Sequence, residues 1–495
     1  MKEEKYILSI DQGTTSSRAV LFDKEQNIVC IEQKEIKQYY PFKGWVEQSP
    51  EEIWQTSYES ALKILEKRKL TSNEIAAIGI TNQRETTIVW DKKTGKPLHR
   101  AIVWQDTRTA KYCEDIKHSS YFNIIKRKTG LLVDSYFSAT KIKWILDKYD
   151  KDRERSKKGE LLFGTIDTWL LWKLTNGELH YTDYSNASRT MLFDINKKDW
   201  SNELLDFFNI PKEILPKIKD TSEVYGYTGK NTFEHRIPVS SLVGDQQAAL
   251  FGHQCVNEGM VKNTYGTGCF MLMNTGRKVV KSNHGLLSTI AWHFNGQTTY
   301  ALEGSVFVAG AVIQWLRDQM GLINHSSESE ILATKVDDNN GVYFVPAFTG
   351  LGAPHWDGST QGAIIGLTRD SNKYHIVRAA LESMAYQTKD VLYSMVTDSN
   401  IDLNKIYVDG GAVDNNFLMQ FQSDILNADI IRTEKKESTA LGSALLAGLA
   451  VGYYSKHDIS DNKSINKIFK PEIDNKLRTK FYTGWLQAVD RVKNI

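Results

Sequence analysis

Two glycine–threonine turns, about half the chain apart, carry the groups best suited to bind a phosphate. Thr14, Thr15 and Ser16 follow Gly13 after a strand-like segment at 6–10, and Thr267 lies between Gly266 and Gly268 after another at 260–263. Glycine lets the backbone approach a ligand closely, and N–H and hydroxyl groups donate to phosphate oxygens. For the first turn alone, an ordinary hairpin rich in hydroxyl side chains is an equally good interpretation.

Two charged residues flank the first turn. Asp11 ends the preceding strand, and its carboxylate is the hard oxygen ligand that Mg²⁺ prefers. Arg18 would add a positive charge beside an anionic ligand. The chain contains neither a P-loop string nor a Gly-x-Gly-x-x-Gly string after a strand. A bound nucleotide would therefore be held by the paired turns.

Glycine recurs where a flat ring could lie against the backbone. Gly410 and Gly411 follow a predicted strand at 406–408, and Asn415 is expected to open the next helix. Gly310 falls within a helix-like stretch that ends at 314–316. A glycine in mid-helix costs about 1 kcal/mol, which indicates close packing against a partner or ligand. For residues 409–412 alone, an ordinary strand-to-helix turn is the favoured interpretation.

A further set of side chains suits a small polyol. Arg84 and Glu85 follow the predicted strand at 75–80 and offer a donor fork beside an acceptor. Asp245 follows the predicted strand at 238–243 and could accept a proton from an attacking hydroxyl. The aromatic rings that could pack on carbon-bound hydrogens are those of Trp104, Tyr136 and Phe270. Taken separately, core packing is favoured for each ring, and a surface ion pair for Arg84 with Glu85.

The elements that position these residues alternate between strands and helices. Strands are expected at 6–10, 18–22 and 27–36, forming two hairpins at the edge of a mixed sheet. A helix is expected from Pro50, with Ser49 as N-cap and Glu52 completing a capping box. Residues 225–236 are expected to form an exposed loop. The alternation predicts an α/β fold.

Composition narrows the function classes. The chain has 495 residues, 41% of them hydrophobic, so at about 150 residues per domain two or three domains are expected. Its 62 basic and 60 acidic residues nearly cancel, which argues against nucleic-acid binding. The longest near-apolar stretch, 444–454, is shorter than the roughly 18 residues of a membrane helix. Four widely spaced cysteines favour a cytoplasmic protein without disulfides or zinc.

Several short sequence strings, in the order in which they occur along the chain, resemble those of the FGGY carbohydrate kinases of the actin-like ATPase superfamily. The matching strings lie at 9–18, 79–86, 244–247, 263–268, 345–354 and 409–412, and the resemblance runs from residue 5 to about 455. Residues 82–86 with 244–247 resemble the members specific for glycerol. The resemblance implies an α/β fold of two actin-like (ribonuclease H-like) domains, each a mixed sheet flanked by helices. Residues 1–250 would bind glycerol and phosphate, residues 251–495 would bind the nucleotide, and the active site would lie in the interdomain cleft.

The activity implied by the resemblance is transfer of the γ-phosphate of MgATP to the 3-hydroxyl of glycerol. Asp245 would be the general base, and Mg²⁺ would lie near Asp11. The implied glycerol contacts are Arg84, Glu85, Trp104, Tyr136, Asp245, Gln246 and Phe270. The implied nucleotide contacts are Thr14, Thr15, Ser16, Arg18, Thr267, Gly310, Gln314, Gly411 and Asn415.

The sequence also bears on oligomeric state, on regulation and on alternative functions. The resemblance implies a homodimer or homotetramer. Some bacterial members bind fructose 1,6-bisphosphate at a glycine-rich loop; the matching residues 228–236 keep Arg236 but lack the run of glycines, which disfavours that inhibition. His235 is a candidate for phosphorylation by the phosphocarrier protein of the sugar phosphotransferase system, although an exposed histidine without this role is favoured. The rivals are another polyol or sugar kinase of the family, an actin- or chaperone-like ATPase, and a non-enzymatic sensor.

Overall fold

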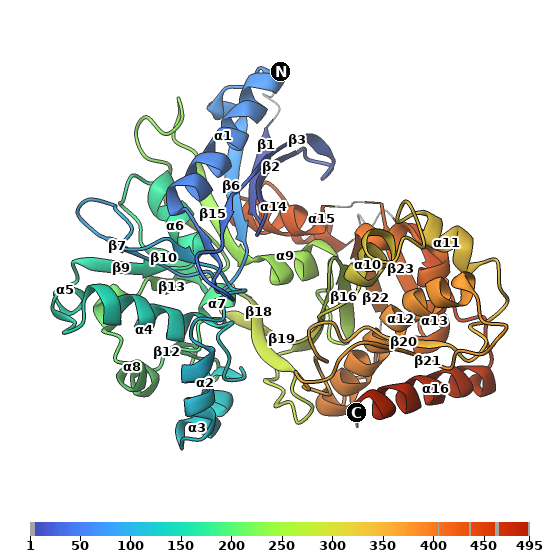
Figure 1. Cartoon of the computed structure of the whole chain (residues 1–495). Helices are drawn as coiled ribbons and strands as arrows, with labels where there is room; N and C mark the ends of the chain where they lie inside the picture. The colour runs from blue at the N-terminus through green and yellow to red at the C-terminus, as the bar shows by residue number, and fades with distance from the viewer. Residues whose placement is uncertain (1–4, 404, 435–436, 461–464, 494–495) are drawn as a thin grey trace.

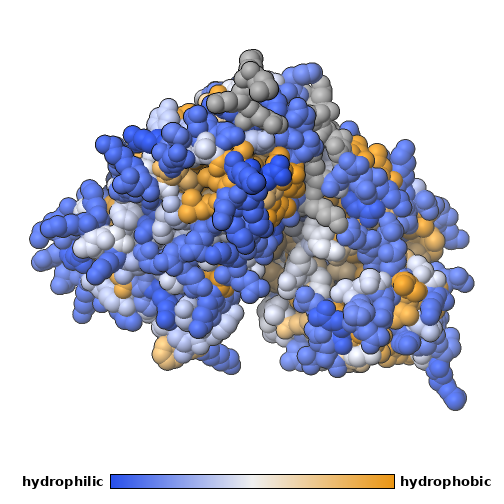
Figure 2. All heavy atoms as spheres, turned by 90° about the horizontal axis from the view of Figure 1, so that it is seen from above, coloured by the Kyte–Doolittle hydropathy of each residue, from blue (hydrophilic) through white to orange (hydrophobic). Residues whose placement is uncertain are grey.

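The chain folds into two lobes, each built on one large mixed sheet flanked by helices (Figure 1). The computed structural model describes residues 5–403, 405–434, 437–460 and 465–493. Most elements of the first half lie on the left in Figure 1 and most of those of the second half on the right. A view from above shows the surface hollowed between the lobes (Figure 2).

The first sheet has six strands in the order β14-β15-β6-β1-β2-β3. Strand β1 pairs with β2 in antiparallel and with β6 in parallel orientation, so the two predicted hairpins do form one edge of a mixed sheet. The expected loop at 225–236 is wrong at its start, because β14 continues to Tyr227. The strands are β1 (Tyr6–Gln12), β2 (Ser16–Phe22), β3 (Ile28–Glu35), β6 (Ile75–Asn82), β14 (Ser222–Tyr227) and β15 (Pro238–Gly244).

The second sheet has seven strands in the order β18-β19-β17-β16-β22-β23-β24. Strand β16 pairs with β17 in antiparallel and with β22 in parallel orientation, as β1 does with β2 and β6. The two halves therefore share a strand arrangement. The strands are β16 (Met260–Tyr265), β17 (Cys269–Gly276), β18 (Leu287–Phe294), β19 (Gln297–Val306), β22 (Lys405–Gly410), β23 (Ile430–Thr433) and β24 (Ile465–Phe469).

The remaining elements cover the sheets and their edges. The helices up to the midpoint are α1 (Pro50–Arg68), α2 (Ala110–Lys117), α3 (Tyr121–Thr129), α4 (Ser138–Tyr149), α5 (Glu154–Lys157), α6 (Ile166–Leu174), α7 (Tyr184–Ala187), α8 (Asn202–Phe208) and α9 (Asp245–Gly252). The later helices are α10 (Gly310–Asp318), α11 (Glu328–Ala333), α12 (Lys373–Ser399), α13 (Asn416–Leu426), α14 (Ser438–Ala450), α15 (Lys456–Ser460) and α16 (Asn475–Lys493). Short strands pair as β4 (Gln38–Tyr39) with β5 (Glu47–Gln48) and β8 (Ala101–Ile102), β7 (Ile88–Asp91) with β9 (Leu161–Gly164), β10 (Tyr181–Asp183) with β13 (Lys217–Lys219), β11 (Phe193–Asp194) with β12 (Asp199–Trp200), and β20 (Tyr343–Val345) with β21 (Ala363–Ile365).

Helix α1 begins as predicted but is capped differently. Ser49 Oγ accepts from the Glu52 backbone N–H at 3.3 Å, and Pro50 is the first helical residue. Glu52 Oε1 accepts from the Lys37 backbone N–H at 2.9 Å rather than closing the box on Ser49. The glutamate thus ties the helix start to the segment after β3, a tertiary contact that a local pattern does not contain.

Two helices from different halves cross between the sheets. Helix α14 packs against β1, β6 and β15 of the first sheet and against α9. A Cβ on Gly442 would collide with the Ala248 carbonyl, and one on Gly252 with the Ser438 carbonyl. The crossing is therefore as close as two helix backbones allow, and glycine is required on both sides.

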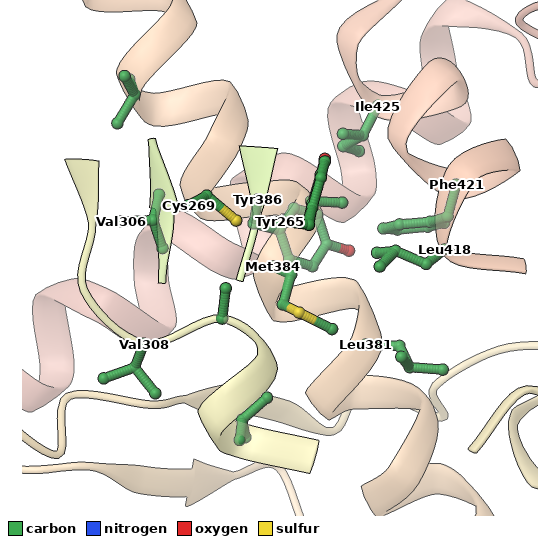
Figure 3. Packing of buried hydrophobic residues seen from close by; sticks show 14 of the residues in the cluster. Tyr265, Cys269, Val306, Val308, Leu381, Met384, Tyr386, Leu418, Phe421 and Ile425 are labelled. Atoms are coloured by element: carbon green, nitrogen blue, oxygen red, sulfur yellow. The ribbon is translucent and has the colours of Figure 1, made fainter. Parts of the chain in front are cut away.

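The second half has a continuous apolar core beneath its phosphate-type turn. Tyr265, the last residue of β16, is buried among Met384, Leu418 and neighbouring side chains from α12 and α13 (Figure 3). Its hydroxyl donates to Gln422 Oε1 at 2.5 Å. This packing anchors the strand end from which the second turn projects.

Candidate active site

The two glycine–threonine turns occupy corresponding places, each joining a central strand to its antiparallel neighbour. In the first, between β1 and β2, the Gly13 N–H donates to Ser16 O at 2.9 Å. In the second, between β16 and β17, the Gly266 N–H donates to Gly268 O at 2.8 Å. Thr15 and Thr267 are exposed, which leaves their hydroxyls accessible to a ligand.

The second turn is fixed to the start of α10. The Gly310 N–H donates to Gly266 O at 3.0 Å, and the Ala311 N–H to Thr267 O at 3.1 Å. Gly310 is the first residue of the helix, so the predicted mid-helix position is wrong. The predicted close packing is confirmed, since a Cβ on Gly310 would lie 2.5 Å from Gly266 O. Gln314 follows one turn later on this helix and is exposed.

The glycine pair after β22 meets the same turn. Gly410 has φ +94°, and a Cβ there would collide with the Tyr265 carbonyl, so only glycine suits this position. A Cβ on Gly411 would meet nothing within 4 Å among the described residues, which leaves its backbone open to a ligand. Asn415 caps α13, with its Oδ1 accepting from the Leu418 N–H at 2.9 Å.

The residues predicted to contact a polyol come together in one small cavity. Its volume is about 140 Å³, below the roughly 300 Å³ at which pockets for drug-sized ligands begin. The lining residues are Thr14, Arg84, Glu85, Trp104, Tyr136, Asp245, Gln246 and Phe270. All seven members of the predicted polyol set therefore share one site, and Thr14 joins them from the first turn.

Arg84 lies at the centre of a buried charge network. Its Nε is 3.2 Å from Asp245 Oδ1, while its two terminal nitrogens donate to the Glu303 carboxylate at 2.5 and 3.0 Å. Arg189 donates to Glu85 Oε1 at 2.6 Å and to Glu303 Oε1 at 2.9 Å. The surface ion pair favoured for Arg84 with Glu85 alone is wrong, because both side chains are buried.

The network sets the protonation of its carboxyl groups. Burial by itself raises the pKa of Glu303, but the guanidinium groups of Arg189 and Arg84 outweigh it and lower the pKa to about 2. Burial raises the pKa of Glu85, although Arg189 and Arg84 oppose the shift. Arg84 thus stays charged and bound to Glu303 while its Nε faces Asp245.

Glu85 has a strained backbone, with φ +61° in the left-handed region. Such a residue costs on the order of 1–3 kcal/mol unless its surroundings hold it. Here its carbonyl accepts from Thr87 Oγ1 at 3.0 Å, Ser138 Oγ at 3.1 Å and Lys141 Nζ at 3.4 Å. Three donors on one carbonyl fix the strained peptide, and strain of this kind is typical of functional sites.

Aromatic rings connect the cavity to the first turn. Trp104 Nε1 donates to Thr14 Oγ1 at 2.9 Å. Its ring meets Tyr136 edge-on with centroids 5.5 Å apart and Phe270 with centroids 6.5 Å apart. Phe270 belongs to β17 of the second half. The cavity wall is therefore built from both halves.

Asp11 fits the requirements of a magnesium ligand. No described residue hydrogen-bonds to its carboxylate, and burial raises its pKa to about 7, with Arg18 opposing and Glu437 and Asp245 adding to the shift. Proteins usually hold Mg²⁺ with one or two carboxylates plus substrate phosphates and waters.

Arg18 joins the two halves beside Asp11. Its guanidinium is hydrogen-bonded and ion-paired to Glu437, the residue before α14, and its Nε donates to Gln33 Oε1 at 3.1 Å. The side chain is therefore held between the first sheet and the start of α14, where an anionic ligand could compete for it.

Three charged residues of the site were not predicted from the sequence: Arg189, Lys262 and Glu303. Glu303 interrupts an apolar strand, and a lone charge in such a run is a usable signal of a buried ion pair. Lys262 gives the same signal in β16. For Arg189 the sequence holds no comparable signal, because its role depends on how the segment after α7 folds over the cavity.

The geometry suits transfer of a phosphoryl group to a hydroxyl. A carboxylate, Asp245, lines a small polar cavity that Thr14 connects to the first donor-rich turn. Phosphoryl transfer depends on alignment of the two substrates and on stabilisation of charge, rather than on covalent chemistry by the protein. A site built from two halves can bind one substrate from each half and bring the two together.

Comparison with known proteins agrees with this chemistry. The "Glycerol kinase" of Brevibacillus brevis is 58% identical over 488 residues, with 98% of each chain covered. A crystal structure of Plasmodium falciparum glycerol kinase with ADP is 40% identical with a TM-score of 0.94, and covers 99% of this chain and 98% of that one. A gluconate kinase from Lactobacillus acidophilus has the same fold at 22% identity, with a TM-score of 0.88 and 99% and 98% coverage.

Family models identify both halves. The N-terminal domain of the FGGY family of carbohydrate kinases matches residues 6–252, and the C-terminal domain of that family matches residues 261–451. Together these ranges contain every strand of the two large sheets except β24 and the first residue of β16. The chain belongs to the FGGY family of carbohydrate kinases.

Proposed function

We propose that this chain is an ATP-dependent glycerol kinase, which transfers the γ-phosphate of ATP to the 3-hydroxyl of glycerol. The products are sn-glycerol 3-phosphate and ADP. One observation carries the proposal: the seven side chains expected to contact glycerol line a single cavity of about 140 Å³. The cavity suits a short polyol better than a sugar acid or a pentose.

In the proposed mechanism, buried polar groups orient the acceptor. Arg84 and Glu85 bind neighbouring hydroxyls, Tyr136 and Gln246 add polar contacts, and the rings of Trp104 and Phe270 cover the carbon-bound hydrogens. Asp245 accepts the proton of the attacking hydroxyl as the new P–O bond forms. The Arg84 guanidinium, whose Nε lies 3.2 Å from Asp245 Oδ1, orients this carboxylate beside the acceptor cavity.

The donor-rich turns bind the nucleotide in this mechanism. Thr14, Thr15 and Ser16 with Arg18 face the phosphates from the first half, and Thr267 faces them from the second. The adenosine lies against Gly310, Gln314, Gly411 and Asn415. When bound at Asp11, Mg²⁺ supplies positive charge that offsets the charge on the transferring phosphate. The substrate roles divide near residue 250, although Phe270 of the second half lines the acceptor cavity and Glu303 of the second half binds Arg84 behind it.

One assay separates the proposed function from its rivals. ADP release from MgATP is measured with glycerol, with xylulose or gluconate, and without an acceptor. Strong dependence on glycerol is expected. Equal rates without an acceptor would indicate an actin- or chaperone-like ATPase, faster turnover of a sugar would indicate another kinase of the family, and no turnover would indicate a sensor.

The finer predictions concern regulation and assembly. We expect a homodimer or homotetramer, which sedimentation analysis of the purified chain tests. His235 is exposed and its backbone N–H donates to Ser72 Oγ at 2.6 Å, so its ring is accessible to a phosphocarrier protein. Incubation with the phosphocarrier followed by mass spectrometry of the His235 peptide distinguishes phosphorylation from an exposed histidine without this role.

We also expect the protein to be cytoplasmic. Cys30, Cys113, Cys255 and Cys269 are all free, and free thiols are usual in a reducing compartment. Within the described part of the chain, no helix has both the length and the apolar character needed to traverse a bilayer.

A further inference from the structure

Lys262 is a fully buried ammonium beside the acceptor cavity. It lies on β16, and none of its surface is exposed. Its Nζ donates to Gln246 Oε1 and, at 3.1 Å, to Thr264 Oγ1. Gln246 lines the cavity, so Lys262 contacts a cavity residue directly without lining the cavity itself.

The complete burial of the Lys262 ammonium requires an explanation. Removing an ammonium from water is costly unless it is paired with an opposite charge. Within the described residues no carboxylate oxygen forms an ion pair with Lys262, in contrast to Arg84 and Arg189, which both contact Glu303. Its Nζ instead contacts the neutral amide of Gln246 and the hydroxyl of Thr264, so a direct ion pair does not explain the residue.

The contact determines which end of the amide is available to the acceptor. An amide side chain has one acceptor oxygen and one donor NH₂ group, and rotation of the amide exchanges them. Because Lys262 can only donate, it bonds to Oε1, which leaves Nε2 as the free group of Gln246. A hydroxyl oxygen of the acceptor then receives a hydrogen bond from Nε2.

We propose that Lys262 is a positioning residue for the acceptor, acting by holding the Gln246 amide with its Nε2 available to a glycerol hydroxyl. This inference rests on the proposed glycerol kinase function and names the group that orients one of its contacts. Thr264, the second partner of Nζ, lies on the same strand just before the Thr267 turn. Lys262 therefore also connects the acceptor contact to the strand that carries a phosphate turn.

The first test compares kinetic constants of Lys262→Met, Lys262→Arg and wild type. For K262M the KM for glycerol should rise about tenfold, the effect of losing about 1.4 kcal/mol of binding. The KM for ATP should change less than about twofold, and K262R should recover most of the loss, because it keeps the donor and the charge. The matched control is Lys389→Met, which removes a half-buried ammonium that donates to Ile425 O at 2.8 Å in the second half. K389M should keep the wild-type KM for glycerol.

A double-mutant cycle tests whether Lys262 acts through Gln246. Gln246→Leu alone should raise the KM for glycerol. If the lysine only orients this amide, adding K262M to Q246L should have little further effect. Additive effects of the two substitutions would contradict the proposed route.

A pH profile gives a third readout that a purely structural role would not move. Burial lowers the pKa of Lys262 to about 8, with Asp409, Asp245 and Glu303 opposing the shift and Arg84 adding to it. As the pH rises through 8, the ammonium loses its charge and a donor, so the wild-type KM for glycerol should rise. The guanidinium of K262R stays charged there, so its KM should remain level.

The outcomes are distinguishable. If wild type releases no glycerol-dependent ADP, the proposed function fails and this inference with it. If wild type is active and K262M keeps a normal KM for glycerol, or raises both KM values equally, only the role of Lys262 is overturned. If K262M does not fold, a level wild-type KM for glycerol between pH 7 and 9 would overturn it instead.

Discussion

Glu303 shows how a single buried residue can organise a site that it does not line. It belongs to the second half, yet it binds Arg84 and Arg189, which in turn contact Asp245 and Glu85. Replacing both charges of such a network can be tolerated, whereas removing one leaves its partners uncompensated. We therefore expect the geometry of the acceptor cavity to depend on this carboxylate.

Glu303→Gln should lower the free energy of unfolding by about 3–5 kcal/mol and raise the KM for glycerol, because two buried guanidinium groups lose their shared anion. Urea denaturation with kinetics measures both. The carboxyl pKa falls from 4.5 in the unfolded chain to about 2 in the folded one, so its stabilisation is complete above about pH 4.5 and is lost as the pH falls toward 2. The difference between wild type and E303Q should narrow over that window. Glu25→Gln, at an exposed position in the turn between β2 and β3, is the control and should change neither value.

Asp245→Asn tests the proposed general base. Loss of the proton acceptor should lower kcat about 10²- to 10⁴-fold, while the KM for ATP stays near the wild-type value because the nucleotide contacts lie elsewhere. Steady-state kinetics with glycerol and MgATP measures the effect. Near-normal turnover would show that another group accepts the proton.

At the scale of elements, short sequence patterns predicted those strands and helix starts that depend on neighbouring residues alone. The strand at 75–80, the start of α1 at Pro50 and the helix opened by Asn415 all follow from short-range signals and are confirmed. The Gly310 prediction failed in its position, because the helix start is set by hydrogen bonds to the turn at 266–268, far away in sequence. Glu303, which binds Arg84, and Arg189, which shares that carboxylate, were missed for the same reason, since both reach the site only through the tertiary fold.

The crossing of α9 and α14 depends on Gly442. Gly442→Ala places a Cβ against the Ala248 carbonyl, so the helices must separate, at a cost of about 1–3 kcal/mol. Thermal unfolding should show a lower midpoint for G442A. Gly358→Ala is the matched control, because a Cβ there meets no described atom within 4 Å, and it should leave the midpoint unchanged. An equal midpoint in G442A would show that the crossing has room to spare.

At the scale of the whole molecule, the two lobes contribute to one site. Arg18 of the first half binds Glu437 of the second, and Trp104 meets Phe270 across the cavity wall. The two glycine–threonine turns occupy equivalent places because the halves share a strand order, with β1 between β6 and β2 and β16 between β22 and β17. The repeated turn does not reveal which helix packs against which sheet, because α14 is distant in sequence from the strands that it covers.

Closure of the lobes should protect the phosphoryl group from water. With glycerol and a non-hydrolysable ATP analogue both bound, small-angle X-ray scattering should show a smaller radius of gyration than with either ligand alone, because contacts to both halves favour the closed form. A radius that does not change would indicate that the lobes are already closed in the free protein. Phe270→Ala should weaken this response, since it removes a second-half contact to the acceptor.

The position of α14 has a consequence for how the protein is made. The strands β1 and β6 leave the ribosome early, but the helix that buries one face of them is encoded near the end of the chain. Until then Ile7, Val20 and Ala77, which share an apolar cluster with Ala444, would face solvent. A nascent chain that stalls shortly after α9 should therefore expose apolar surface, tend to aggregate and depend on chaperones, although it already carries all six strands of the first sheet.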